Sequence, residues 1–197
     1  MLAIVDSGGA NIASVRFALE RLGVESALTA DPAVIRSAER VILPGVGSAQ
    51  AGMQRLRDRG LVDCVRGLRQ PVLGICLGMQ LLFESSEEGA TASLGLVPGR
   101  VALLPESPGI TVPHMGWNTL KLLQDSPLLQ GFAAETRFYF VHSFAGPVNE
   151  FTVAACEHGA AFAAVVQRVN FYGVQFHPER SGAAGARLLR NFLELPA

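Results

Sequence analysis

A single cysteine stands between two glycines where a short apolar segment gives way to a segment of helical spacing. Residues 71–75 predict a buried strand and residues 77–83 predict the start of a helix, so Cys76 falls in the turn between them. Gly74 and Gly78 keep side chains out of this tight turn. A nucleophile at a strand-to-helix turn is typical of a nucleophile elbow, and the N–H groups that begin the next helix favour the thiolate. The pattern predicts nucleophilic catalysis by Cys76.

A histidine and a glutamate far downstream supply the base that a cysteine nucleophile needs. His177 and Glu179 flank a proline and follow residues 171–176, which predict another buried strand. Residues two apart in an extended chain point to the same side, so we expect both side chains to converge on one cleft. They complete a Cys-His-Glu triad in which Glu179 orients His177 and stabilises its imidazolium. A buried cysteine alone would be a weak indication, but the two segments together favour catalysis over coincidence.

The elements around these residues predict an α/β fold. In the first half, strands are expected at 2–5, 24–28, 40–43 and 72–75, and helices at 11–22 and 50–57. This alternation is typical of a mostly parallel central sheet with helices on both faces, which binds ligands at the carboxyl ends of its strands, where Cys76 falls.

The second half of the chain has a different pattern. Strands are expected at 101–104, 119–122, 138–141, 152–155 and 163–167 without long helices between them, and a helix at 183–195 ends the chain. This order predicts an antiparallel extension of the sheet. With no linker or repeat in between, we expect one domain over residues 1–197.

Composition excludes several classes of function. The 197 residues are 49% hydrophobic, which favours a packed globular core over disorder. The net charge of −1, from 16 basic and 17 acidic residues, gives no indication of binding to nucleic acid or to an anionic membrane. Three cysteines fit a reducing compartment better than a disulfide framework. Neither a signal pattern nor an apolar run of the ~18 residues of a membrane span is present, so we expect a soluble cytoplasmic protein.

Nearly the whole chain resembles the class I, triad-type glutamine amidotransferases. The cysteine elbow and residues 175–179 (Gln-Phe-His-Pro-Glu) are typical of that class. Met79, where several sister families carry His, and residues 113–118 (Pro-His-Met-Gly-Trp-Asn) resemble the glutaminase subunits of imidazole glycerol phosphate synthases. Residues 44–47 and 141–143 match as well. The resemblance implies a flavodoxin-like fold, no cofactor or metal, and hydrolysis of glutamine to glutamate and ammonia in histidine biosynthesis.

The resemblance also implies roles for individual residues. The backbone N–H groups of Leu77 and Val46 would form the oxyanion hole, and Gly45 would let the Gly45–Val46 peptide flip into place. The implied glutamine-binding residues are Gly47, Gln80, Glu88, His142 and Ser143.

The implied partner is a (β/α)8-barrel cyclase subunit that forms a heterodimer with this chain and builds the imidazole ring with the ammonia. Asn11, Trp117 and Arg180 are the implied interface residues. Two positions depart from the family pattern: Ser7 and Phe144 stand where tyrosine is common, which affects partner contacts and fine specificity rather than the triad.

Other interpretations of these residues remain open at this point. Gln80 could be an exposed helix residue, Glu88 part of a solvated acidic run at a helix end, and Trp117 a cap on the core from a Gly- and Pro-rich loop. Alternative functions are the glutaminase of anthranilate or aminodeoxychorismate synthase, a cysteine peptidase of the same sheet architecture, and a catalytically silent subunit. An intact triad with intact pocket residues argues against the last two.

Overall fold

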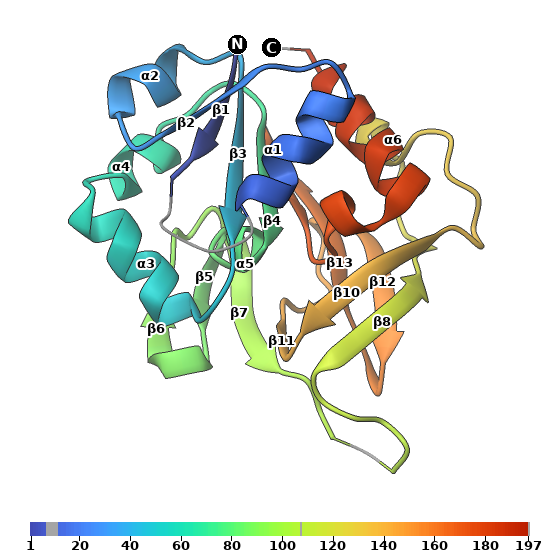
Figure 1. Ribbon diagram of the computed structural model, residues 1–197. Helices are drawn as coiled ribbons and strands as arrows, with labels where there is room; N and C mark the ends of the chain where they lie inside the picture. Colours follow the sequence, from blue (N-terminus) through green and yellow to red (C-terminus); the bar gives the residue numbers. More distant parts are fainter. Residues whose placement is uncertain (7–11, 107, 197) are drawn as a thin grey trace.

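The computed structural model describes residues 1–6, 12–106 and 108–196 as one layered α/β arrangement (Figure 1). The elements of the first half are β1 Leu2–Val5, α1 Ile12–Arg21, β2 Ser26–Thr29, α2 Pro32–Ser37, β3 Arg40–Gly45, α3 Ala49–Asp58, α4 Val62–Arg66, β4 Val72–Cys76, α5 Leu77–Gln80, β5 Phe83–Ser86, the 3-10 turn η1 Glu88–Ala90 and β6 Thr91–Ala92. Those of the second half are β7 Val97–Leu103, β8 His114–Thr119, β9 Lys121–Leu122, η2 Pro127–Leu129, β10 Arg137–His142, β11 Phe144–Ala145, β12 Thr152–His158, β13 Ala160–Arg168, β14 Phe171–Val174, η3 Pro178–Arg180 and α6 Gly182–Leu193.

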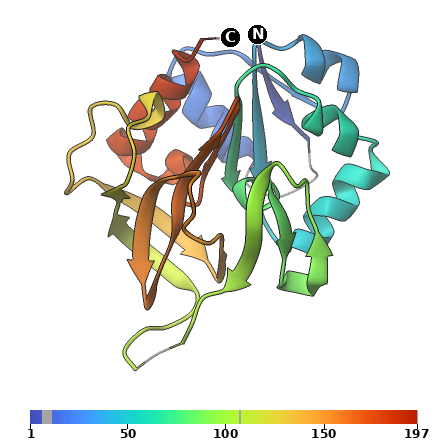
Figure 2. The ribbon, with the colours of Figure 1, turned by 180° about the vertical axis from the view of Figure 1, so that it is seen from behind.

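The central sheet has eight strands in the order β2-β1-β3-β4-β14-β13-β12-β9. Pairing is parallel from β2 through β14 and antiparallel from β14 to β9, so the predicted parallel half and antiparallel extension are both confirmed. The β12–β13 hairpin is drawn in orange in Figure 2. Two smaller sheets flank the central one: β10 pairs with β8, and β11-β7-β5-β6 form a row of four.

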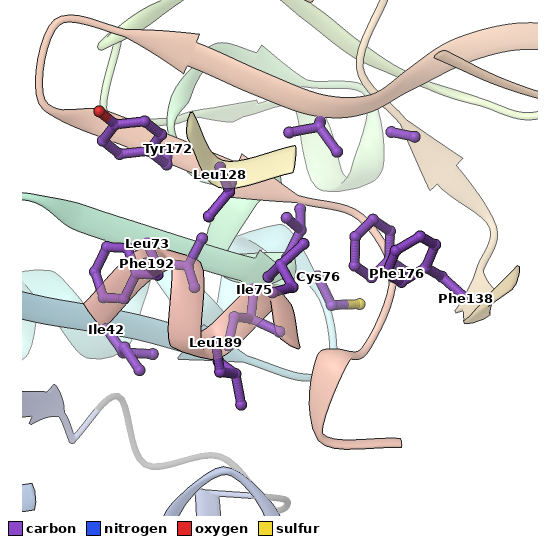
Figure 3. Packing of buried hydrophobic residues seen from close by; sticks show 14 of the residues in the cluster. Ile42, Leu73, Ile75, Cys76, Leu128, Phe138, Tyr172, Phe176, Leu189 and Phe192 are labelled. Atoms are coloured by element: carbon purple, nitrogen blue, oxygen red, sulfur yellow. The ribbon is translucent and has the colours of Figure 1, made fainter. Parts of the chain in front are cut away.

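Two clusters of buried side chains cover the two faces of this sheet. Strand β1 divides its side chains between them, with Ile4 in one cluster and Val5 in the other. Helices α1 and α6 cover the first face and α2, α3 and α4 cover the second (Figure 1). Figure 3 shows Cys76 at the edge of the first cluster, so this residue is attached directly to the packed core.

The segment after Cys76 differs from the prediction. The expected helix over 77–83 ends at Gln80, after one turn, and Phe83 begins strand β5, which pairs with β7. Because Phe83 is fully buried, its packing overrides the local helical spacing. The acidic residues that follow therefore do not lie at a helix end. Glu84 and Glu87 accept hydrogen bonds from backbone N–H groups of residues 99 and 103.

Three further differences concern the shorter elements. Trp117 lies in strand β8, paired with Tyr139 of β10, and not in a loop, because pairing with β10 extends the Gly-rich segment. The expected strand over 119–122 is split between the end of β8 and the short β9. Helices α2 and α4 were not predicted. Helix α2 begins at Pro32 after Asp31, whose side chain accepts from the Ala33 N–H, a start signal that the sequence does contain.

Candidate active site

The cysteine turn is a tight elbow between β4 and α5. Cys76 has a φ of +52°, an unusual backbone conformation for a residue with a side chain, and such strain costs about 1–3 kcal/mol. A Cβ at Gly74 would lie 2.7 Å from the Gly78 carbonyl oxygen, and one at Gly78 would overlap the carbonyl oxygen of Leu43. Both glycines flanking the nucleophile are therefore required by close backbone contacts, as the sequence predicted.

The helix that follows Cys76 is shorter than expected. The sequence predicted a helix that starts at residue 77 and continues through residue 83, but α5 contains only Leu77–Gln80. One turn aligns few peptide dipoles, so its positive end is weak. The side chains that contact the sulfur, His177 and Gln175, are therefore the stronger polar neighbours of Cys76.

His177 and Glu179 meet as predicted, by a different route. The Nδ1 atom of His177 donates to Oε1 of Glu179 at 2.7 Å, and the two side chains are 5% and 1% exposed. The chain here is not extended, because Pro178–Arg180 form the 3-10 turn η3, which brings Glu179 back toward the imidazole ring. The Nδ1 contact leaves Nε2 as the ring nitrogen for Cys76.

Electrostatics favour a charged imidazole at His177. Burial lowers the pKa of His177, but hydrogen bonds to Cys76 and Glu179 and the negative charge of both outweigh it and raise that pKa to about 10. At neutral pH the ring is therefore protonated when the cysteine is a thiolate. A thiolate beside an imidazolium is the reactive form of a cysteine nucleophile.

Ser181 holds the backbone of His177, a role that the sequence interpretation missed. Its buried hydroxyl donates to the His177 carbonyl at 2.7 Å and accepts from the Tyr139 N–H at 3.0 Å. The His177 N–H in turn donates to the Tyr139 carbonyl at 2.9 Å. A Cβ at Gly185 would overlap the carbonyl of Pro178, so helix α6 closes tightly on this turn. The small residues after Glu179 were the feature of the sequence from which this close packing could have been predicted.

A pocket of about 460 Å³ opens beside the elbow and the imidazole. It is large enough for an amino acid substrate. Its lining includes Cys76, His177 and every residue predicted for the oxyanion hole or for glutamine: Leu77, Val46, Gly47, Gln80, Glu88, His142 and Ser143. Val141, Phe144 and Arg180 complete it. The structure thus brings together the loop after β3 and residues from β4, α5, η1, β10, β11 and η3.

The loop after β3 forms one wall of this pocket. Gly47 has a φ of +91°, which suits glycine, and the Val46 carbonyl accepts from Arg55 at 3.3 Å. Glu88 accepts from the Ala49 N–H at 2.6 Å, at the start of helix α3. Glu88 is half-buried and both lines the pocket and anchors this loop, so it is not merely part of a solvated acidic run.

Gln80 is buried rather than exposed, and it leads to a second glutamine. Its Nε2 atom donates to the Phe144 carbonyl at 2.8 Å and to Oε1 of Gln175 at 3.0 Å. Gln175 is fully buried, and its own Nε2 lies 3.8 Å from Sγ of Cys76 as a hydrogen-bond donor. Gln175 belongs to the segment that carries the family resemblance but was not assigned a role. Its signal was a polar residue within an apolar segment of the sequence.

His142 belongs to a buried group of aromatic side chains. Its Nδ1 atom donates to the Phe144 carbonyl at 2.9 Å, and its Nε2 lies 3.2 Å from Nδ1 of His114. The His114 ring stacks on Phe140 and on His158, with centroids 4.8 and 4.2 Å apart. Burial lowers the pKa of His142 to about 3 and that of His114 to about 4, with nearby histidines adding to the effect, so both rings are neutral.

Two of the three residues predicted for a partner interface, Trp117 and Arg180, lie beside the pocket. Trp117 is 51% exposed on β8, and its ring contacts that of Tyr139 at 5.8 Å between centroids. The Arg180 guanidinium lies 4.6 Å from the centroid of the same tyrosine ring. Met115, two residues before Trp117, is 63% exposed on the same strand. Asn11 and Ser7 lie outside the described residues.

Comparison with known proteins shows which family this chain matches. The model of the family "Glutamine amidotransferase class-I" matches residues 3–195. The imidazole glycerol phosphate synthase subunit HisH of Xanthomonas axonopodis pv. citri (strain 306) is 57% identical over 98% of this chain and 97% of the relative. The subunit of the same name from Xylella fastidiosa (strain Temecula1 / ATCC 700964) is 56% identical over 100% and 98%.

Solved structures share the fold. A Thermoplasma acidophilum protein described as belonging to a GMP synthase has a TM-score of 0.75 at 18% identity, over 98% of this chain and 91% of that one. A structure described as a glutamine amidotransferase also has a TM-score of 0.75, at 20% identity over 98% and 97%. Among the helices of the described residues, none is long and apolar enough to cross a membrane.

Proposed function

The chain belongs to the class I glutamine amidotransferase family, and from this premise we propose that it is the glutaminase subunit of an imidazole glycerol phosphate synthase. It hydrolyses glutamine to glutamate and ammonia and serves histidine biosynthesis. The observation that carries this proposal is the identity of 57% to a full-length HisH relative, together with a Cys76–His177–Glu179 arrangement that opens on a pocket of suitable size.

We propose that Cys76, His177 and Glu179 form the catalytic triad. The Cys76 thiolate attacks the side-chain carbonyl carbon of glutamine and forms a tetrahedral intermediate. His177, held at Nδ1 by Glu179, gives its Nε2 proton to the departing nitrogen, which leaves as ammonia, and a thioester remains. His177, now neutral, takes a proton from water. The resulting hydroxide attacks the thioester, which releases glutamate and restores the thiolate–imidazolium pair.

The tetrahedral oxygen needs backbone donors, and we assign them to the N–H groups of Leu77 and Val46. Both residues line the pocket beside Cys76, and Leu77 directly follows it. A flip of the Gly45–Val46 peptide would switch the second donor on and off. Structures with and without a glutamine-derived thioester test this step, because an unchanged peptide orientation would exclude the flip.

The pocket lining supports binding of an amino acid. We propose that Glu88 contacts the substrate α-amino group and that Gly47, Gln80, His142 and Ser143 complete the glutamine site. The half-buried carboxylate of Glu88 provides the negative charge that an ammonium group requires. The Gln80 amide donates to Phe144 and Gln175, so its part in binding is to shape the wall.

The name of the HisH relatives describes one part of a larger synthase, and we propose that this chain, as one domain over residues 1–197, docks on a (β/α)8-barrel cyclase in the cytoplasm. Arg180, Trp117 and Asn11 are the proposed contacts. The exposed Trp117 and Met115 give the face beside the pocket an apolar character suited to an interface. Ammonia passed across this interface would avoid protonation in bulk water.

The experiment that tests the proposal measures glutamate release from glutamine by the chain alone and with the cyclase plus its nucleotide substrate, for wild type and Cys76→Ala. Low activity alone, a strong increase with the liganded cyclase, and none in Cys76→Ala are expected. Strong activity that does not change when the cyclase is added would contradict the proposed partner. Activity that survives in Cys76→Ala would contradict the triad.

A further inference from the structure

Gln175 lies against the reacting sulfur but has no part in the triad. It is fully buried in the chain segment between β14 and His177, and its Nε2 atom points an N–H at Sγ of Cys76 over 3.8 Å. A donor in contact with a sulfur stabilises that sulfur when it is negatively charged. The contact matters only if the amide faces the sulfur with its nitrogen, not its oxygen.

The neighbours of Gln175 fix that orientation. Oε1 of Gln175 accepts from Nε2 of Gln80 at 3.0 Å, and the other proton of the same Nε2 goes to the Phe144 carbonyl at 2.8 Å. A carbonyl oxygen only accepts hydrogen bonds. If the Gln80 amide turned around, its Oε1 would face the Phe144 carbonyl oxygen, acceptor against acceptor. If Gln175 turned around, its Nε2 would face the Nε2 of Gln80, donor against donor. The Phe144 carbonyl therefore sets both amides.

A second branch positions that carbonyl. Nδ1 of His142 must donate to the Phe144 carbonyl at 2.9 Å, so Nε2 of the neutral ring is an acceptor. Nδ1 of His114, 3.2 Å away, must then be the donor, and its Nε2 accepts from Nδ2 of Asn118 at 3.4 Å. Every bond in this branch has one permitted direction. The low pKa values of both rings agree with their neutral state.

We propose that Gln175 is a further catalytic residue that stabilises the charged Cys76 sulfur, and that His114 and Asn118 are positioning residues that fix its orientation through His142, Phe144 and Gln80. This chain of donors and acceptors is called the amide relay below. The proposal rests on the glutaminase function, yet its first test needs no glutamine.

The first experiment measures alkylation of Cys76 by iodoacetamide at fixed pH, with the site confirmed by peptide mapping, in wild type and Gln175→Met. Methionine has a similar length but no donor. The expected result is an alkylation rate about tenfold lower, because a hydrogen bond to a charged group is lost. Glutamate release with the cyclase should show a similar fall in kcat and a change in KM of less than about twofold. An unchanged alkylation rate with a raised KM would overturn the proposal and assign Gln175 to the pocket wall alone.

The second experiment separates the hydrogen bond of His114 from its ring. His114→Phe keeps the stacking on Phe140 and His158 but removes the Nδ1 donor, whereas His114→Asn keeps a donor near the Nδ1 position. We expect His114→Phe to lower the alkylation rate about threefold and His114→Asn to restore most of it. Equal losses in both variants would show that the ring, not the donor, matters, and would overturn the positioning role.

Combining substitutions tests whether the residues act as one chain. If His114 acts only through Gln175, the double variant Gln175→Met/His114→Phe reacts no more slowly than Gln175→Met alone, whereas independent effects would multiply and contradict the relay. Should His114→Phe fail to fold, Asn118→Asp replaces it. Its carboxylate accepts from His114 Nε2 and reverses the direction of the branch, so alkylation should slow, and an unchanged rate would overturn the relay.

Failure of this inference is distinguishable from failure of the glutaminase function. Wild-type protein that alkylates rapidly at Cys76 but releases no glutamate would contradict the proposed function and leave the amide relay to be judged by its variants. Wild-type glutaminase activity with no effect of Gln175→Met on alkylation would contradict only the amide relay. Thermal unfolding of each variant shows that the compared proteins are folded.

Discussion

The two sides of the pocket beside Cys76 are built in different ways. On the side of the Cys76 elbow, backbone packs directly on backbone, and a Cβ at Gly78 would overlap the carbonyl oxygen of Leu43. On the opposite side, strands β8 and β10 pair through their backbones, and side-chain hydrogen bonds near the pocket, such as that between His114 and His142 at 3.2 Å, link the polar groups that face it. One side depends on the absence of side chains and the other on their particular polar atoms.

The two sides should therefore respond differently to substitution. Where backbone packs on backbone with no spare space, an added side-chain atom cannot be accommodated by a small shift. A substitution on the elbow side should therefore destabilise the whole fold. Hydrogen bonds can be replaced by other donors, so changes on the side of β8 and β10 should alter rates by degrees and leave the fold intact. The substitutions below test that contrast, in order of decreasing effect.

The largest effect is expected where the two sides meet, at the triad. Glu179→Gln removes the charge that stabilises the His177 imidazolium and weakens the 2.7 Å hydrogen bond to Nδ1. We expect kcat for glutamine hydrolysis with the cyclase to fall on the order of 10³-fold, as expected when the orienting carboxylate of a triad is lost. Steady-state kinetics measure this, and Glu84→Gln, on the surface away from the pocket, is the matched control. A loss below tenfold would contradict the role of Glu179.

A substitution in the elbow is expected to destabilise the whole protein. Gly78→Ala places a methyl group on the Leu43 carbonyl, and we expect it to lower the free energy of unfolding by about 3 kcal/mol or more, as overpacking of a rigid site does. Gly23→Ala is the control, since Gly23 has a φ of +75° but open space around its Cβ position. It should cost about 1 kcal/mol, from backbone strain alone. Urea unfolding compares them, and equal losses would contradict the close-contact argument.

The face that carries Trp117 is expected to affect assembly alone. Trp117→Ala removes a half-exposed aromatic side chain, and we expect the Kd for the cyclase to rise about tenfold or more, as for an aromatic anchor of an interface. The rate of Cys76 alkylation in the free chain should stay within about twofold. Titration calorimetry measures the affinity, with Leu28→Ala, an exposed residue on strand β2 at the far edge of the sheet, as control. Equal affinity for Trp117→Ala and wild type would exclude Trp117 from the interface.

The most gradual effect is a slope of stability against pH. The folded-state pKa of His177 is about 10 and its ordinary value is 6.5, so the folded chain holds the proton more tightly. This contribution to stability is fully present below about pH 6.5 and is lost as pH rises toward 10. Urea unfolding at several pH values in this window should show a shallower loss in Glu179→Gln than in wild type. Identical slopes would contradict the stabilised imidazolium.

The elbow could be predicted from sequence because its cause is local. Two glycines around one cysteine, after an apolar strand, leave few other structures for the segment. The pairing of His177 with Glu179 was predicted correctly but for an extended chain, whereas a 3-10 turn forms it. Residue types thus indicated the chemistry even where the expected backbone conformation was wrong.

The parts that could not be predicted depend on contacts between distant segments. Burial of Phe83 ends α5 after one turn, and pairing with β10 makes a strand of the segment around Trp117. The roles of Gln175 and Ser181 depend on which atoms face them across the fold, and local periodicity carries no such information. Buried polar residues within apolar segments are the signal worth following in related chains.

The parallel pairing of β4 with β14 also sets when the triad can exist during the life of the chain. Tyr172 pairs with Leu73 and Gly173 with Gly74, so nucleophile and base lie at the ends of adjacent strands that are far apart in the sequence. Such non-local pairs form late in folding, because a long loop must close first. A chain in which β14 has not yet paired with β4 carries the Cys76 thiol without His177 beside it. The proposed triad can therefore act only after this non-local pairing has formed, which makes the onset of activity a report on the closure of the central sheet.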